Sequence, residues 1–108
     1  MDDALLTRLR ALAGELAGAT FDYPFGPNTA VYRVAGKMFA LFSEERGLTV
    51  KAPPELVEQL CADHAAVTPG YHMSKRHWVT IALDGSVPQE LLRDLLVDAH
   101  ALVQPGRR

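Results

Sequence analysis

The sequence predicts an α+β domain in which an antiparallel sheet carries helices on one face. Apolar residues recur at three- and four-residue spacing near both ends of the chain, which is typical of amphipathic helices. Between them lie short β-rich runs separated by turn residues, which indicate antiparallel strands. The 108 residues, of which 48% are hydrophobic and 22% charged, suit one compact domain spanning 1–108. The predicted order is helix, three strands, helix, two strands, helix.

Three segments have helical patterns. The first begins near Asp2 and Asp3, whose carboxylates suit a helix N-terminus, and ends at about 18–20. The second runs from the prolines at 53–54 to about His64, and the third runs from about 86–88 to Val103, before a tail that is expected to fray. On each helix, the apolar residues expected to face the core form an inner stripe, which consists mainly of leucine. In the order of the helices, these residues are Leu5, Leu9, Leu12 and Leu16; Leu56, Val57, Leu60 and Cys61; and Leu91, Leu92, Leu95, Leu96, Ala99, Leu102 and Val103.

The first three strands follow a stretch that contains two prolines. Residues 21–30 are predicted to form an irregular loop because Pro24 and Pro27 break regular hydrogen bonding, and aromatic residues at 21, 23 and 25 are expected to tie this loop to the core. Strands are then predicted at 31–34, 37–42 and 48–51. In the middle strand, we expect positions 38, 40 and 42 to face one way and positions 37, 39 and 41 the other.

Residues 67–83 contain the most unusual chemistry of the chain. Positions 77–83 alternate, so Val79, Ile81 and Leu83 are predicted to lie in the core while Trp78 points to the opposite face. Aromatic, histidine and cationic residues gather here: Tyr71, His72, Lys75, Arg76, His77 and Trp78. This combination suits an anionic or stacking partner. In the alternative interpretation, this stretch has no binding role. Another element of the fold then covers Trp78, and the charged residues only keep an exposed loop in contact with water.

The charges are distributed unevenly although the net charge is only −2. Residues 31–51 and 67–83 contain six Lys or Arg against two Glu, a net charge of +4, so the rest of the chain carries −6. If these segments form one sheet and the remainder forms helices behind it, the sheet side is basic. We therefore expect a contiguous positive patch that contains Lys37, Lys51, Lys75 and Arg76.

Several classes of protein lack support in the sequence. No run approaches the roughly 20 apolar residues that span a bilayer, and the charged N-terminus is unlike a signal peptide, so we expect a cytoplasmic protein without a membrane partner. Cys61 is the only cysteine, which excludes a disulfide framework and a thiolate zinc site. Nucleotide-binding, zinc-protease and redox motifs are absent, and no carboxylate lies near His72 or His77 to orient it as a base or ligand. We expect no cofactor and no enzymatic activity.

Four segments carry a resemblance to a known family: YPFGP at 23–27, GKMFAL at 36–41, TPGYHMSKRHW at 68–78 and LDG at 83–85. They resemble the MmcQ/YjbR family of small bacterial proteins, and the match runs almost end to end. The resemblance implies an α+β fold similar to bacterial frataxin (CyaY) and DNA binding through a double-wing arrangement. The chain departs from the family pattern at Ser74 and Val79.

Together these observations predict a monomeric, non-catalytic protein that binds DNA, or another nucleic acid, on its open sheet face. Lys37, Lys51, Lys75 and Arg76 are expected to contact phosphates, Trp78 and Tyr71 to stack on bases, and His72 and His77 to donate hydrogen bonds that strengthen at lower pH. Two alternatives stay open. One is a protein-interaction module that uses the Trp78 face. The other is a frataxin-like metal-binding or regulatory protein, for which the first helix offers only Asp2, Asp3 and Glu15 as carboxylates.

Overall fold

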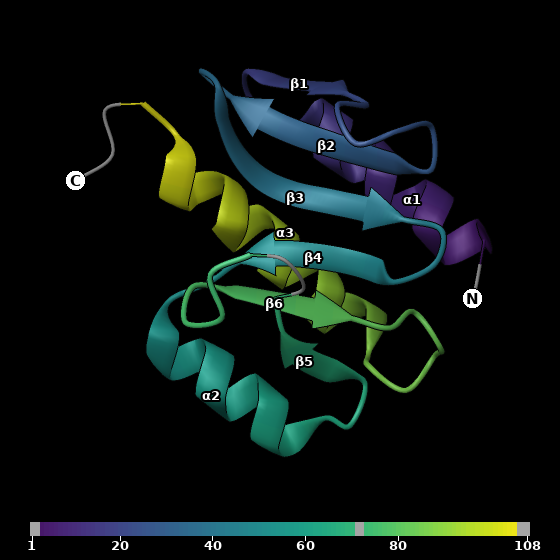
Figure 1. Cartoon of the computed structure of the whole chain (residues 1–108), viewed down its shortest axis with the longest axis vertical. Helices are drawn as coiled ribbons and strands as arrows, with labels where there is room; N and C mark the ends of the chain where they lie inside the picture. Colours follow the sequence, from purple (N-terminus) through teal and green to yellow (C-terminus); the bar gives the residue numbers. More distant parts are fainter. Residues whose placement is uncertain (1–2, 71–72, 106–108) are drawn as a thin grey trace.

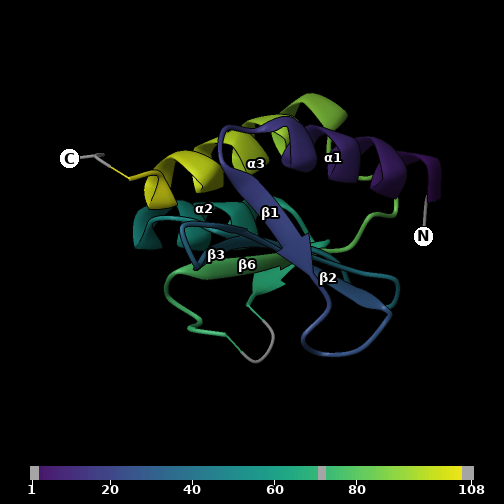
Figure 2. The same cartoon turned by 90° about the horizontal axis from the view of Figure 1, so that it is seen from above.

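The computed structural model describes residues 3–70 and 73–105 of the chain. Within these residues, three helices and six strands follow one another as α1 (Asp3–Glu15), β1 (Ala19–Asp22), β2 (Thr29–Val34), β3 (Lys37–Ser43), β4 (Gly47–Lys51), α2 (Pro54–Asp63), β5 (Val67–Pro69), β6 (Trp78–Ile81) and α3 (Gln89–Val103). The strands form one antiparallel sheet in the order β1-β2-β3-β4-β6-β5. The helices lie on one side of it (Figures 1 and 2). The α+β class and the placement of helices on one face are confirmed.

The edge strand β1 was not predicted from the sequence. Phe21 lies opposite Tyr32, and Asp22 lies opposite Val31, so part of the expected irregular loop is a regular strand. Three of the four β1 residues are exposed, so the strand lacks the apolar alternation by which the others are recognised. The helix α1 ends earlier than expected, at Glu15, and the Ala19 amide donates to the Leu16 carbonyl in the turn that leads into β1.

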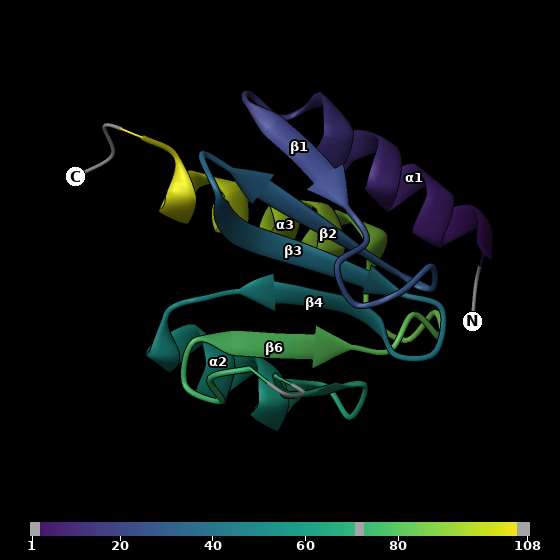
Figure 3. The ribbon, with the colours of Figure 1, turned by 45° about the horizontal axis from the view of Figure 1, so that its top comes forward.

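Arg10 on α1 connects the helix to this edge of the sheet, where Figure 3 shows β1 beside α1. Its Nε donates to the Tyr32 hydroxyl at 3.1 Å, and its Nη2 donates to the Tyr23 hydroxyl at 2.9 Å. The guanidinium also lies 5.5 Å from the centre of the Phe21 ring, which is a cation–π contact. Burial lowers the pKa of Arg10, but the hydrogen bonds to the two tyrosines outweigh this effect and leave the pKa raised. Arg10 therefore stays charged and holds β1 in place.

A β-bulge in β3 changes the face on which several of its side chains lie. Tyr32 pairs with Ala40 while the next residue, Arg33, pairs with Met38, so Phe39 is the extra residue. Phe39 and Ala40 both pack in the core under the helices, together with Phe42. Met38 and Leu41 contact the separate cluster around Trp78 instead. The expected strict alternation is therefore wrong, with Met38 and Phe39 on the faces opposite to those predicted.

The main core lies between the sheet and the three helices. The predicted inner stripes supply buried residues from every helix, and Val79, Ile81 and Leu83 join them as expected. Leu102, which was predicted for the stripe of α3, is instead 38% exposed. His100 of α3 is also buried, with its Nε2 donating to the Ala17 carbonyl at 2.7 Å and its ring edge against Phe39 at 5.4 Å between centroids. This hydrogen bond links α3 to the residues that follow α1. Among the described residues, no helix combines the length and apolar character needed to cross a bilayer.

Candidate functional site

The sheet face opposite the helices, here called the open face, has a small apolar cluster of its own. Val31, Leu41 and Trp78 are buried in it, and Met38 and Met73 pack against them while remaining partly exposed. Two connections project on this side of the sheet: the dark-blue loop between β1 and β2, and the described part of the green connection before β6 (Figure 2). The open face is therefore covered by loops rather than by helices.

Trp78 points to the open face, as the alternation predicts, but it is only 7% exposed. The chain can pack closely on Trp78 at position 70 because this residue is a glycine. A Cβ at that position would lie 2.6 Å from the Trp78 Cβ and 3.2 Å from the Met73 Cβ. The Gly70 amide also donates to the Trp78 carbonyl at 2.8 Å. The alternative in which Trp78 is covered is therefore confirmed, and stacking of the indole on a base stays a prediction.

Lys75 and Arg76, the cations predicted near Trp78, lie at the same end of the open face as Trp78. Lys75, Arg76 and His77 are exposed in the segment 73–77 that precedes β6. Lys51 lies directly opposite Trp78 in the register of β4 and β6, and its neighbour Ala52 donates to the His77 carbonyl at 2.9 Å. The Lys75 ammonium reaches back to the Gly70 carbonyl at 3.4 Å. The β4–β6 pairing thus brings Lys51 next to the segment that carries Lys75 and Arg76.

Lys37 does not belong to this group. It lies opposite Val34, whose side chain is part of the core under the helices, and directly opposed residues of an antiparallel pair point to the same face. Lys37 is therefore exposed on the helix side of the sheet, and the expectation of one patch with four cations is wrong in this member. Arg33 lies on the open face, but it forms an ion pair with Asp22 that balances its charge. The predicted Tyr71 and His72 lie outside the described residues.

A groove on the open face was not anticipated from the sequence. It has a volume of about 450 Å³, and it is lined by Phe25, Thr29, Leu41, Ser43, Glu45, Arg46, Thr49 and Met73. Phe25 comes from the β1–β2 loop, Met73 from the segment before β6, and the others from β2, β3, β4 and the β3–β4 turn. The Phe25 side chain is 64% exposed, so the expectation that it ties its loop to the core is wrong. The sequence signal that could have indicated this exposed position is an aromatic residue between two prolines and beside a glycine.

Hydrogen bonds fix the polar end of the groove. The Ser43 hydroxyl accepts from the backbone amides of Glu45 and Arg46, each at 3.2 Å, and this orders the β3–β4 turn. On the neighbouring strands the hydroxyls of Thr49 and Thr80 lie 3.0 Å apart and share a hydrogen bond. Apolar surface from Phe25, Leu41 and Met73 therefore faces a preorganised polar end, which is the arrangement of a small-molecule or base-binding site.

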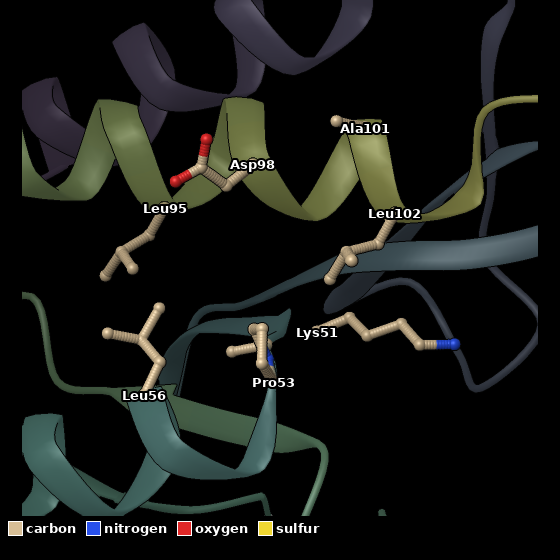
Figure 4. Close-up of a pocket in the computed structure, with 8 residues that line it drawn as sticks. Lys51, Pro53, Leu56, Leu95, Asp98, Ala101 and Leu102 are labelled. Carbon is tan, nitrogen blue, oxygen red and sulfur yellow. The ribbon is translucent and has the colours of Figure 1, made fainter. Parts of the chain in front are cut away.

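A smaller pocket of about 210 Å³ lies on the helix side, between α2 and α3 (Figure 4). Leu56 and Leu95 point toward each other across it. Its two charged side chains, Lys51 and Asp98, point away from each other rather than converging. Without convergent polar groups this pocket offers no basis for specific recognition, so the open face is the better candidate.

The described residues include few groups that could bind a metal ion or act as a nucleophile. Residues 3–70 and 73–105 place no group of three or more His, Cys, Asp or Glu where it would hold a metal ion. Cys61 on α2 is half-buried, and burial raises the pKa of its thiol, so the nucleophilic thiolate is depleted at neutral pH. The frataxin-like metal-binding alternative therefore lacks a ligand set in the described part of the chain.

The model of the YjbR family matches residues 14–102. The chain belongs to this family, as the MmcQ/YjbR resemblance predicted. It is 37% identical to Escherichia coli O157:H7 YbdF over 103 residues, covering 90% of this chain and 82% of YbdF. It is 39% identical to YjbR of Escherichia coli K12 over 70 residues, covering 62% of this chain and 58% of YjbR. These names state no activity.

Solved structures support the same architecture. The crystal structure of Deinococcus radiodurans protein DR2400, a DUF419 domain, matches with a TM-score of 0.85 and 37% identity, covering 94% of this chain and 79% of that one. A crystal structure from Pseudomonas syringae matches with a TM-score of 0.78 and 26% identity, covering 96% and 100%. This chain therefore shares its arrangement of sheet and helices with these two proteins.

Proposed function

We propose that this protein binds nucleic acid on its open face, without catalysing a reaction. The observation that carries the proposal is the position of the exposed pair Lys75–Arg76 in the same short segment as Met73, which lines the groove. Cations of this kind contact phosphates, and an exposed aromatic ring on the groove that Met73 also lines provides a surface on which a base can stack. Phe25 takes the stacking role that the sequence assigned to Trp78.

The two projecting connections support the double-wing arrangement that the family resemblance implies. One carries Phe25 and the other carries Lys75 and Arg76, and the groove lies between Phe25 and Met73. The antiparallel sheet with helices on one face is also consistent with the proposed likeness to bacterial frataxin (CyaY). A monomeric protein in the cytoplasm, where bacterial DNA lies, is part of this proposal.

Salt dependence of binding tests the phosphate contacts. Fluorescence anisotropy of labelled single-stranded and duplex oligonucleotides should show affinity falling between about 50 and 200 mM salt. Contacts from Lys75 and Arg76 predict a slope of log affinity against log salt of about −1.4 for single strands and about −1.8 for duplex. Binding that is independent of salt would contradict the proposal.

A charge-matched pair of variants locates the binding surface. Lys75→Gln combined with Arg76→Gln should weaken binding and reduce the magnitude of the single-strand salt slope by about 1.4. The control combines Arg8→Gln with Arg93→Gln, which removes the same charge from the pocket between α1 and α3 on the helix side. This control should leave binding almost unchanged. Equal losses in the two double variants would show that only net charge matters, and would contradict a site on the open face.

One observation favours a second candidate, which is a protein-interaction module on the same face. Phe25, Leu41 and Met73 form an apolar surface that an aromatic or aliphatic side chain of a partner would also fill. The two candidates differ in the role of the cations. A protein partner held mainly by the groove should be insensitive to the Lys75→Gln and Arg76→Gln substitutions, whereas nucleic acid should not.

A further inference from the structure

The groove combines an apolar surface, a polar end and adjacent cations, and we propose that it holds one unpaired nucleobase. This inference rests on the proposed nucleic-acid binding and specifies which part of the ligand enters the groove. The groove volume of about 450 Å³ lies within the range of about 300–1,000 Å³ in which small-molecule sites are found. Because Met73 lines the groove two residues before Lys75, a strand whose phosphates contact this segment passes beside the groove.

The apolar side of the groove suits the face of a base. Phe25 exposes 64% of its surface, and a base stacked on the ring would remove apolar area from water. Met73 approaches from the other connection, and its polarisable thioether packs well against aromatic rings. Leu41 on strand β3 also lines the groove, where it is 8% exposed. A flat ring in the groove would therefore meet apolar surface from three separate elements.

The polar end of the groove provides a basis for base selection. Glu45 stands on the turn that Ser43 orders, and it lines the groove. A carboxylate accepts hydrogen bonds from the exocyclic amino groups of cytosine, adenine and guanine, whereas thymine has no such group. We therefore expect amino-bearing bases to bind more tightly than thymine.

The same geometry selects single strands over duplex DNA. In a duplex, each base is stacked on both faces and its pairing edge is occupied by its partner. Phe25 could not stack on the face of such a base without displacing a neighbouring base, which costs free energy. Binding of a base in the groove thus requires an unpaired nucleotide.

Short oligonucleotides of deoxycytidine and of thymidine, titrated at one salt concentration, test the proposal. The wild-type protein should bind oligodeoxycytidine more tightly than oligothymidine, and Glu45→Ala, which removes the hydrogen-bond acceptor, should abolish this preference. Phe25→Ala should weaken binding of oligodeoxycytidine by about fivefold or more, the loss expected when one base no longer stacks, while Phe25→Tyr should retain binding. Phe21→Ala is the matched control, since Phe21 is 52% exposed but stacks on Tyr32 on the helix side.

The outcomes separate the base site from the proposed function. If Phe25→Ala binds like the wild type while the Lys75→Gln and Arg76→Gln variant loses affinity, nucleic acid binds the open face but no base enters the groove. If Phe25→Ala weakens binding and the wild type does not distinguish the two oligonucleotides, the role of Glu45 is wrong. If the wild type binds neither oligonucleotide, the base site is wrong, and the proposed function is wrong as well if duplex DNA does not bind either. Thermal melting of each variant confirms that it folds.

Discussion

The two faces of the sheet bury apolar side chains in different ways. On one face, helices present continuous apolar stripes, and residues such as Phe39, Leu92 and Leu96 are almost completely buried. On the open face, only short connections cover a small cluster, and they contribute single side chains such as Met73. The groove beside the exposed Phe25 lies on the loop-covered face, where a ligand can enter without disturbing the main core.

The largest expected difference between the faces concerns two phenylalanines. Phe39→Ala should lower the free energy of unfolding by about 3–5 kcal/mol, because it empties a site at the β-bulge that is 0% exposed. Phe25→Ala should change it by less than about 0.5 kcal/mol, because its ring is mostly in solvent. Urea unfolding of both variants measures the contrast. Similar losses in the two variants would show that the groove is part of the structural core.

Trp78 tests how well loops cover the open face. Its fluorescence in the wild-type protein should be blue-shifted, since the indole is only 7% exposed. Trp78→Ala should lower the free energy of unfolding by about 3 kcal/mol, at the low end of the usual range, because the flexible Met73 side chain can move into the space. Red-shifted emission combined with wild-type stability of Trp78→Ala would mean that the loops do not cover this face.

Gly70 permits the close cover, and a substitution there should disturb it. Gly70→Ala places a Cβ 2.6 Å from the Trp78 Cβ, so we expect a loss of about 1–3 kcal/mol and a red shift of Trp78 emission. Gly14→Ala on α1 is the matched control, because its Cβ would meet nothing within 4 Å. This control should be neutral or stabilise the protein by up to about 1 kcal/mol. A harmless Gly70→Ala would show that the segment before β6 is not packed on Trp78.

The smallest expected effect comes from Asp84, in the turn before α3. Hydrogen bonds from the Ser86 hydroxyl, at 2.7 Å, and from the Ser86 amide, at 2.9 Å, lower the pKa of Asp84. A lowered pKa in the folded state contributes stability above the unfolded pKa of about 3.9, and this contribution is lost as the pH falls through the folded value. Asp84→Asn should therefore melt slightly below the wild type at neutral pH and together with it in strong acid. A difference that persists in acid would show that Asp84 acts through something other than its charge.

Much of the helix-covered face was predictable from periodicity alone. The leucine stripe of α3 and the alternation through Val79 and Ile81 both identified residues that are buried in the main core. The bulge at Phe39 was not predictable, because an extra residue changes the face of its neighbours without leaving a local signal. The strand β1 was missed for a related reason, since its exposed residues pair through the backbone and show no alternation.

The candidate site was predicted only in part. Sequence spacing identified Lys75, Arg76 and the face of Trp78, because these follow directly from one short stretch. The groove depends on residues brought together from the β1–β2 loop, the β3–β4 turn and the segment before β6. Such long-range contacts are set by strand order, which no local pattern encodes. The position of Lys37 also followed only from the register with Val34.

Amide chemical-shift mapping during titration with a single-stranded oligonucleotide tests the central claim most directly. Binding on the open face predicts that the largest changes occur around the groove and the cations beside it, at Phe25, Leu41, Ser43, Met73, Lys75 and Arg76. Residues on the helix side, such as Arg8 and Arg93, should change little. Changes that cluster on α1 and α3, with none around the groove, would contradict the account.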